Sequence, residues 1–213
     1  MGRVAGVTAA QTRERLLAAA ADAFARNGYD GTRVAEIAKA AKVSNGALYA
    51  HFASKAELLA AALREHGPRL LDQTLGSEPG RPVTAMLMRA GRKLRHRRDA
   101  CGELIVEALA AARRDADLAV LMREYVGERG QLIAERVRQA QDHGEIDPAL
   151  TPTAVAHFCL LLGLGSALVT PDLHAVGEDE WSALLTTLIR AISSEPSPGR
   201  HSFPQDEEQG ENA

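Results

Sequence analysis

The strongest constraint on the fold is the close succession of helix-start signals between residues 32 and 54. Thr32, Ser44 and Ser54 are hydroxyl residues of the kind that cap helix N-termini, and each precedes apolar residues at helical spacing. Behind Ser54, Glu57 completes a capping box. This region therefore predicts two short helices and the start of a longer one, joined by tight turns.

A longer helix precedes these elements, and five more follow them. Thr8 and Gln11 fit a capping box, and Asn27-Gly28 ends the first helix because glycine tolerates a left-handed C-terminal conformation. The chain has one Trp, three Tyr and four Phe, whereas Ala and Leu dominate its apolar share, which disfavours sheets. We expect an all-α protein of about nine helices, the later ones over residues 83–98, 101–113, 116–142, 152–169 and 178–193.

The net charge of −3 is unevenly distributed along the chain. Residues 1–60 carry 8 Lys and Arg against 5 Asp and Glu, a balance of +3. Residues 61–192 have a balance of −2, and residues 193–213 one of −4. The overall acidity, which argues against a nucleic-acid binder, hides a basic N-terminal segment.

Two short helices joined by a tight turn form a helix-turn-helix, whose second helix can enter the major groove of B-DNA. Here that helix begins at Ser44. Asn45 can pair with an adenine edge, Gly46 allows close backbone approach, and Ala47 can contact a thymine methyl. Leu48 and Phe52 are expected to face the core. Similar short-helix patterns also occur in all-α proteins that bind no DNA, so the pattern alone leaves both interpretations open.

The run from Phe24 to Leu58 resembles part of the N-terminal domain of the TetR-like transcriptional regulators, and the whole resemblance extends over about fifty residues. The most specific part is the run Leu48-Tyr49-Ala-His51-Phe52-Ala-Ser54-Lys55-Ala-Glu-Leu58. The resemblance implies a helix-turn-helix domain at residues 1–55 and a helical effector-binding and dimerisation domain at residues 56–193. Residues 194–213 are rich in Pro, Ser, Gly and Glu, which predicts a disordered acidic tail.

Family resemblance also implies the contacts with DNA. Thr32, Tyr49, His51 and Lys55 stand where the family contacts phosphates, and each can donate a hydrogen bond. Lys42 departs from the pattern, because the family usually has glycine in the turn, and a left-handed lysine costs about 1 kcal/mol. Arg33 is larger than the usual residue and could reach a phosphate or a base edge. The expected DNA-binding residues are Thr32, Arg33, Lys42, Ser44, Asn45, Gly46, Ala47, Tyr49, His51 and Lys55.

In this family the last two helices form a four-helix bundle across a homodimer. Helix 152–169 carries small residues spaced by seven and four, and helix 178–193 carries a stripe of large apolar residues; both suit such a bundle or an ordinary core. The expected dimer-interface residues are Ala156, Leu160, Gly163, Ala167, Trp181, Leu184, Leu185 and Leu188.

A small-molecule pocket is expected between helices 116–142 and 152–169, where apolar residues mix with a few polar ones. Its expected lining is Met122, Tyr125, Val126, Arg129, His157, Phe158 and Leu161, with a solid core as the alternative. The basic run at residues 89–98 suits an anionic effector or a position near DNA, and equally a solvated helix face. The effector would therefore be largely apolar, with room for an anionic part.

The sequence predicts a ligand-responsive repressor that binds a palindromic DNA operator as a homodimer. An activator and a thiol-based sensor acting through Cys101 or Cys159 are the alternatives. We expect no enzyme, cofactor or metal site, because no catalytic or metal-ligand pattern occurs in a suitable setting. The N-terminus lacks a signal-peptide core and the longest apolar stretch, at residues 154–169, is shorter than the ~20 residues that span a bilayer, so we expect a cytoplasmic protein.

Overall fold

The regular structure of the chain consists of helices. The structure is a computed structural model that describes residues 8–66, 83–94, 100–170 and 172–193. In this part of the chain, nine helices and one isolated bridge between Ile146 and Ser193 are found, which confirms the all-α prediction. The helices are α1 (Ala9–Gly31), α2 (Val34–Ala40), α3 (Asn45–Tyr49), α4 (Lys55–His66), α6 (Val83–Leu94), α7 (Ala100–Ala111), α8 (Ala116–Asp142), α9 (Pro152–Leu168) and α10 (Glu178–Ile192).

The predicted helix boundaries agree closely with the observed ones. The bounds of α8 are those expected, and α9 and α10 each end one residue earlier. The last residues of the expected helix 83–98, and the expected tail at 194–213, lie outside the described residues. Within these residues, none of the helices has both the length and the apolar content needed to cross a bilayer.

Local capping explains where the N-terminal helices begin and end. At the start of α1, the Thr8 hydroxyl accepts from Gln11 N at 3.2 Å and the Gln11 amide oxygen accepts from Thr8 N at 2.9 Å, so the expected capping box is present. At Gly28 the backbone has φ 71° and ψ 172°, which breaks the helix before one further turn. Gly28 therefore redirects the chain as expected, because glycine adopts this conformation without steric cost.

One hydrophobic core runs through the N-terminal helices and beyond them. Leu16 and Phe24 of α1 belong to the same buried cluster as Leu58 of α4, Leu104 of α7 and Leu118 of α8. A second, smaller cluster joins the C-terminal half of α8 to α9. The expected domain boundary at residues 55 and 56 falls at the start of α4, and it stays a prediction.

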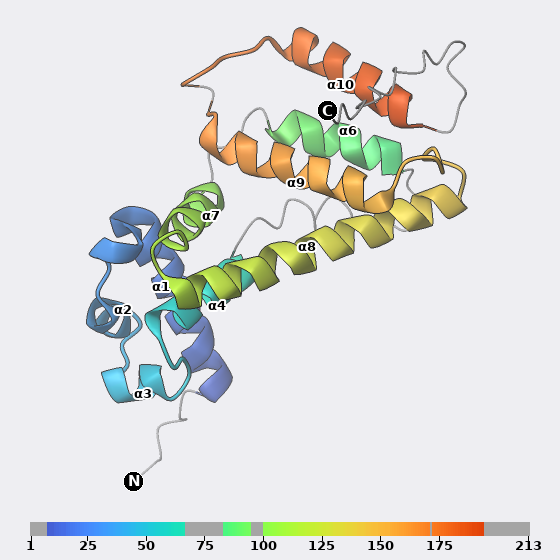
Figure 1. Cartoon of the computed structure of the whole chain (residues 1–213). Helices are drawn as coiled ribbons and strands as arrows, with labels where there is room; N and C mark the ends of the chain where they lie inside the picture. The colour runs from blue at the N-terminus through green and yellow to red at the C-terminus, as the bar shows by residue number, and fades with distance from the viewer. Residues whose placement is uncertain (1–7, 67–82, 95–99, 171, 194–213) are drawn as a thin grey trace, which may run out of the picture.

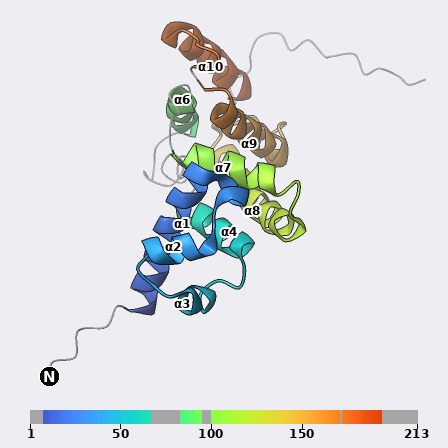
Figure 2. The same cartoon turned by 90° about the vertical axis from the view of Figure 1, so that its left-hand side faces the viewer.

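Helices α1 to α4 form one end of the molecule, which we call the head, and α6, α9 and α10 form the other (Figure 1). Helix α8 extends from the head to the far end beneath α9. The view in Figure 2 shows α7 between the head and the layer of α6, α9 and α10. The head therefore packs on the rest of the molecule through contacts of α1 and α4 with α7 and α8.

Candidate nucleic-acid interface and cavity

The turn between α2 and α3 is a Schellman motif. Lys42 N donates to Lys39 O at 3.0 Å, and Val43 N donates to Ala38 O at 3.0 Å, which satisfies the last carbonyls of α2. Lys42 has φ 58° and is the one non-glycine residue with positive φ in the described part of the chain. The position where the family usually has glycine is thus left-handed here too, so Lys42 carries the strain that the sequence left open.

Two arginines of α1, which sequence reasoning missed, support this turn and the helix after it. The Arg15 guanidinium donates to Ala41 O and lies 3.5 Å from Lys42 O. The Arg13 guanidinium lies 5.5 Å from the centre of the Phe52 ring. No local pattern indicates these contacts, because the partners are more than 25 residues apart.

Helix α3 presents the expected polar residues at its N-terminus. The Ser44 hydroxyl accepts from Ala47 N at 3.1 Å and caps the helix, as the sequence predicted. Asn45 and Gly46 are exposed, and Tyr49 is 55% exposed. Leu48 on the other side is buried in the core. The helix therefore offers a small polar surface on a fixed apolar base.

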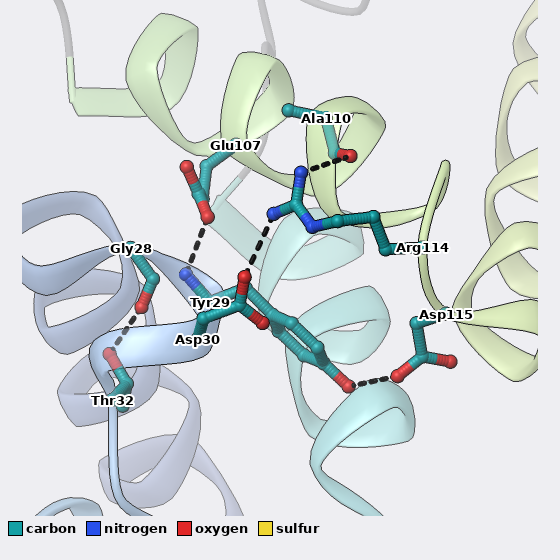
Figure 3. A network of polar contacts seen from close by, with 8 residues as sticks. All are labelled: Gly28, Tyr29, Asp30, Thr32, Glu107, Ala110, Arg114 and Asp115. Carbon is teal, nitrogen blue, oxygen red and sulfur yellow. Dashed lines mark hydrogen bonds and ion pairs between the residues drawn. The ribbon is translucent and has the colours of Figure 1, made fainter.

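Thr32 does not belong to this surface, and its expected phosphate contact is wrong for the side chain. Thr32 is only 2% exposed. Its hydroxyl donates to Gly28 O at 2.6 Å and lies 3.1 Å from Ala23 O (Figure 3). The cap position of α2 is Arg33 instead, without a side-chain hydrogen bond. Thr32 instead holds the broken end of α1. A hydroxyl residue before a helix looks the same in the sequence whether it caps that helix or plays this role.

The remaining expected DNA-binding residues differ in their exposure. Arg33 and Lys42 are exposed, whereas His51 and Lys55 are half-buried. The Lys55 ammonium lies 4.6 Å from the centre of the Tyr29 ring, a cation–π contact inside the head. Lys55 therefore already has a role within the protein, and its phosphate contact stays a prediction.

A cavity of about 440 Å³ lies away from the head. Its size is in the range of small-molecule sites, ~300–1,000 Å³. Arg129 is the one charged side chain among the lining residues of the described chain, and the rest of the lining is almost entirely apolar. The lining comprises Leu87, Ala90, Gly91, Leu94, Ile105, Tyr125, Val126, Arg129, Leu150, Ala154, Val155, Phe158, Cys159, Leu160, Leu162, Gly163, Leu164, Leu185, Leu188, Ile189, Ala191 and Ile192.

The expected pocket residues of α8 and α9 differ in where they lie. Tyr125, Val126 and Arg129 line the cavity, and the Arg129 guanidinium lies 5.4 Å from the centre of the Tyr125 ring. Met122, also expected in the pocket, is instead buried in the core shared with the head. The pocket was expected between α8 and α9 alone, but residues of α6 and α10 also form its walls.

Several residues of α9 lie elsewhere than the sequence predicted, although Phe158 lines the cavity as expected. His157 and Leu161, expected in the pocket, are exposed, whereas Phe158 is half exposed and also lines the cavity. Ala156, expected at the dimer interface, is buried against α8, and Leu160 and Gly163 line the cavity. Ala167 packs on the core that includes the head. These four residues therefore face the interior of their own chain. The sequence could not predict this, because α9 is apolar on nearly every side and no hydrophobic period distinguishes an inner face from an outer one.

Helix α10 shows the same mixture. Leu185 is buried, and together with Leu188 it lines the cavity, although Leu188 is also part exposed. The Trp181 indole donates to Gly91 O of α6 at 2.8 Å, and Leu184 is exposed. Leu185 is thus buried in its own chain, which corrects its expected place in a dimer interface, whereas Trp181 is only partly buried and its interface contact stays a prediction. Of the α10 residues expected there, Leu184 and Leu188 remain available on the surface.

Sequence and structure comparisons agree on the kind of protein. Residues 16–62 match the family described as bacterial regulatory proteins, tetR family. The HTH-type transcriptional regulator UidR of Escherichia coli K12 is 29% identical over 164 residues, which cover 77% of this chain and 82% of UidR. The structure of Salmonella enterica GusR superposes with a TM-score of 0.72 at 26% identity, covering 84% of this chain and 94% of GusR. A TetR-family regulator from Rhodococcus sp. gives 0.71 at 27% identity, over 86% and 98%.

Residues 16–62 are a TetR-family DNA-binding domain, and over most of its length the chain is similar to TetR-like regulators. It is a DNA-binding transcriptional regulator with a helix-turn-helix head. The match to the TetR family over residues 16–62 covers all of α2 and α3, and it therefore includes the surface formed by Asn45, Gly46 and Tyr49. The similarity to GusR over most of both chains extends the family fold to the helices around the cavity.

Proposed function

We propose that this regulator is a repressor that binds a palindromic operator as a homodimer and leaves it when a small effector fills the cavity. The observation that carries this proposal is that one chain combines an exposed, capped α3 with a preformed apolar cavity. Helices α7 and α8 belong to the core of the head and also line the cavity. A change of shape around the cavity can therefore reach the head.

On DNA, the N-terminus of α3 supplies the base contacts. Asn45 pairs with an adenine edge, and the absence of a side chain at Gly46 and the small methyl group of Ala47 allow the backbone to approach the groove. The exposed Arg33, Lys42 and Tyr49 lie on the same helix-turn-helix and donate to phosphates. The basic balance of residues 1–60 supports this orientation of the head.

A second copy of the chain covers the outer face of α9 and α10. Phe158, Leu161 and Leu168 are 50%, 56% and 57% exposed and follow one another at helical spacing on α9. On α10, Leu184 and Leu188 are also exposed. Exposed apolar stripes on two consecutive helices favour a helix bundle across a twofold axis, which presents two α3 helices to the two halves of a palindrome.

The effector is a largely apolar molecule with one anionic group. Its apolar part would contact the lining of Leu, Ile, Val and Ala side chains, and its anionic group would lie beside Arg129. The Tyr125 ring keeps the Arg129 guanidinium at the cavity wall. Arg92 and Lys93 of the basic run are exposed on α6, and residues 95–98 lie outside the described part, so the run adds nothing to this assignment.

Calorimetry tests the effector class. Decanoate should bind the protein more tightly than decanol, which has the same chain length and no charge. Arg129→Lys should retain this preference and Arg129→Gln should lose it, because only the former keeps a cation at the wall. Equal binding of the two ligands by the parent would contradict the anionic class.

Footprinting on DNA upstream of its own reading frame tests the operator. The parent should protect a palindrome, and Asn45→Ala should lose its preference at one base position in each half. Arg33→Ala should weaken all sequences alike and lower the salt dependence of binding, because a phosphate contact carries no sequence information. No protected site, or a site unaffected by either change, would contradict the assigned face.

The thiol sensor receives no support from Cys159. Burial raises the pKa of the Cys159 thiol, which keeps it protonated and poorly reactive. The Cys101 side chain lies outside the described residues. Relatives that match the chain are named as transcriptional regulators, which favours regulation over catalysis.

A further inference from the structure

Tyr29 connects the head to the rest of the molecule through two carboxylates. Tyr29 N, just after the break in α1, donates to Glu107 Oε1 of α7 at 2.6 Å. Its phenol donates to Asp115 Oδ2 at 2.8 Å, in the link between α7 and α8 (Figure 3). Tyr29 itself is buried. We call Tyr29, Glu107 and Asp115 the clamp.

The local structure of α1 makes this contact possible. A Cβ at Gly28 would lie 3.1 Å from Glu107 Oε1, so the absence of a side chain at Gly28 lets the carboxylate reach the backbone. The left-handed Gly28 also turns Tyr29 N out of the α1 hydrogen-bond pattern and toward α7. The break in α1 is thus matched to its acceptor on another element.

Asp115 also has a partner outside the clamp. Its Oδ1 accepts from Leu118 N at 2.9 Å and caps α8, so one carboxylate holds both the head and the first turn of this helix. The bond from Leu118 N, followed by that from the Tyr29 phenol, lowers the pKa of Asp115, which stays ionised at neutral pH. Burial and the bond to Asp115 raise the pKa of Tyr29, which stays a neutral donor.

The helices held by the clamp are also walls of the cavity. Ile105 lies two residues before Glu107 on α7 and lines the cavity. On α8, Tyr125 and Arg129 line it ten and fourteen residues after Asp115, about 15 and 21 Å along the helix. A shift of α7 against α8 caused by a ligand therefore moves the two acceptors of Tyr29 relative to each other.

We infer that Tyr29 is a positioning residue: through Glu107 and Asp115 it fixes the orientation of the DNA-reading head on the two helices that respond to the cavity. This inference rests on the proposed dimeric DNA binding. The clamp sets the distance between the two α3 helices of a dimer, and so the half-site spacing that the protein accepts. Base readout by α3 is independent of the clamp, because Asn45 and Gly46 lie on α3, whereas the clamp joins α1 to α7 and to the start of α8.

Selection from a pool of random DNA duplexes tests the inference. The parent should select one half-site sequence at one spacing. Tyr29→Phe removes only the phenol hydroxyl, and Asp115→Ser keeps a cap for α8 but is too short to reach Tyr29. Both variants should select the same half-site at several spacings and bind the parent's best duplex at least five-fold more weakly. The double variant should bind no more weakly than the weaker single variant, since both changes remove the same bond.

Three further variants separate positioning from mere stability. Glu107→Gln keeps an oxygen acceptor for Tyr29 N and should retain the parent's spacing, whereas Glu107→Ala should not. Arg114→Ala breaks the exposed 2.8 Å pair with Asp30, beside the clamp, and should change neither spacing nor affinity. Circular dichroism confirms that each variant is folded at the binding temperature.

The outcomes are distinct. If Tyr29→Phe and Asp115→Ser select the parent's spacing with unchanged affinity, the inference is overturned and the proposed function stands. The inference is also overturned, and the proposed function stands, if Glu107→Gln and Glu107→Ala select the same half-site spacing. If the parent selects no duplex at all, the proposed function fails and the inference fails with it.

Discussion

Lys42 adopts the left-handed conformation that glycine usually supplies at the C-terminus of a helix. For a lysine, this conformation costs about 1–2 kcal/mol. The two hydrogen bonds of the Schellman motif and the Arg15 guanidinium on the adjoining carbonyls hold it in place. At the residue scale, the turn that orients α3 is therefore stabilised by its surroundings rather than by its own sequence.

Lys42→Gly should increase the free energy of unfolding by about 0.5 kcal/mol. Relief of the left-handed strain exceeds the loss of about 0.4–1 kcal/mol that glycine causes by making the unfolded chain more flexible. Urea denaturation measures the change. The control is Lys39→Gly inside α2, which should decrease the free energy of unfolding by about 1 kcal/mol. A loss of the same size at both positions would show that the turn is not strained.

The Asp115 carboxylate predicts a pH dependence of stability. Its pKa is lower in the folded protein than in the unfolded chain, so its charge stabilises the fold above about pH 4, and this contribution disappears as pH falls through the folded pKa. Asp115→Asn keeps a capping side chain without the charge. The difference in unfolding free energy between parent and variant, measured at pH 7, 5 and 3, should be largest at pH 7 and smallest at pH 3. A difference that does not change with pH would contradict this role.

Helix α9 illustrates what sequence can decide about an element. Its existence and its bounds could be predicted from length and composition, because a long apolar stretch between Pro152 and Pro171 has few alternatives. Its orientation could not be predicted. Leu160 and Leu161 are adjacent and equally apolar, yet one lines the cavity and the other is exposed. Which face lies inward depends on the helices that pack there, and these are distant in sequence.

Two glycines of the cavity walls should respond oppositely to the same substitution. A Cβ at Gly163 of α9 would meet no atom within 4 Å, whereas one at Gly91 of α6 would lie 2.7 Å from both terminal carbons of Leu185. Gly163→Ala should raise the free energy of unfolding by about 0.5–1 kcal/mol, the gain in helix propensity. Gly91→Ala should lower it, because Leu185 must move.

Thermal and urea unfolding of both variants measures this contrast. The two changes are chemically identical and both lie inside helices, so each serves as the control for the other. A gain at Gly91 would mean that α10 does not pack on α6 as described, and a loss at Gly163 would mean that the space beside this residue on α9 is not open.

At the scale of the whole molecule, the proposed dimer depends on a partner that covers the outer face of α9. Leu161→Glu should convert the dimer into a monomer, because a buried carboxylate without a partner is costly to desolvate. Analytical ultracentrifugation measures the mass. The matched control is Val120→Glu on α8, which is also an exposed apolar residue, 45% accessible, and should leave the mass unchanged. A dimer that survives Leu161→Glu would place the interface elsewhere.

The connection between the head and the body is the part of the molecule that sequence reasoning could not reach. Capping at Thr8 and Ser44 was predictable because each cap and its partner lie three residues apart. Tyr29 and Glu107 are 78 residues apart, and Tyr29 and Asp115 are 86 apart. Nothing in the local pattern around Tyr29 distinguishes a buried donor from an ordinary core aromatic.

The bond from the Trp181 indole to Gly91 O has a practical consequence. Trp181 is the one tryptophan of the chain, and its partner lines the cavity. The intrinsic fluorescence of the protein on excitation of indole therefore originates at the joint between α6 and α10. A molecule that enters between these helices and disturbs the joint will change the emission of the unlabelled protein, so compound libraries can be screened optically without knowledge of the operator.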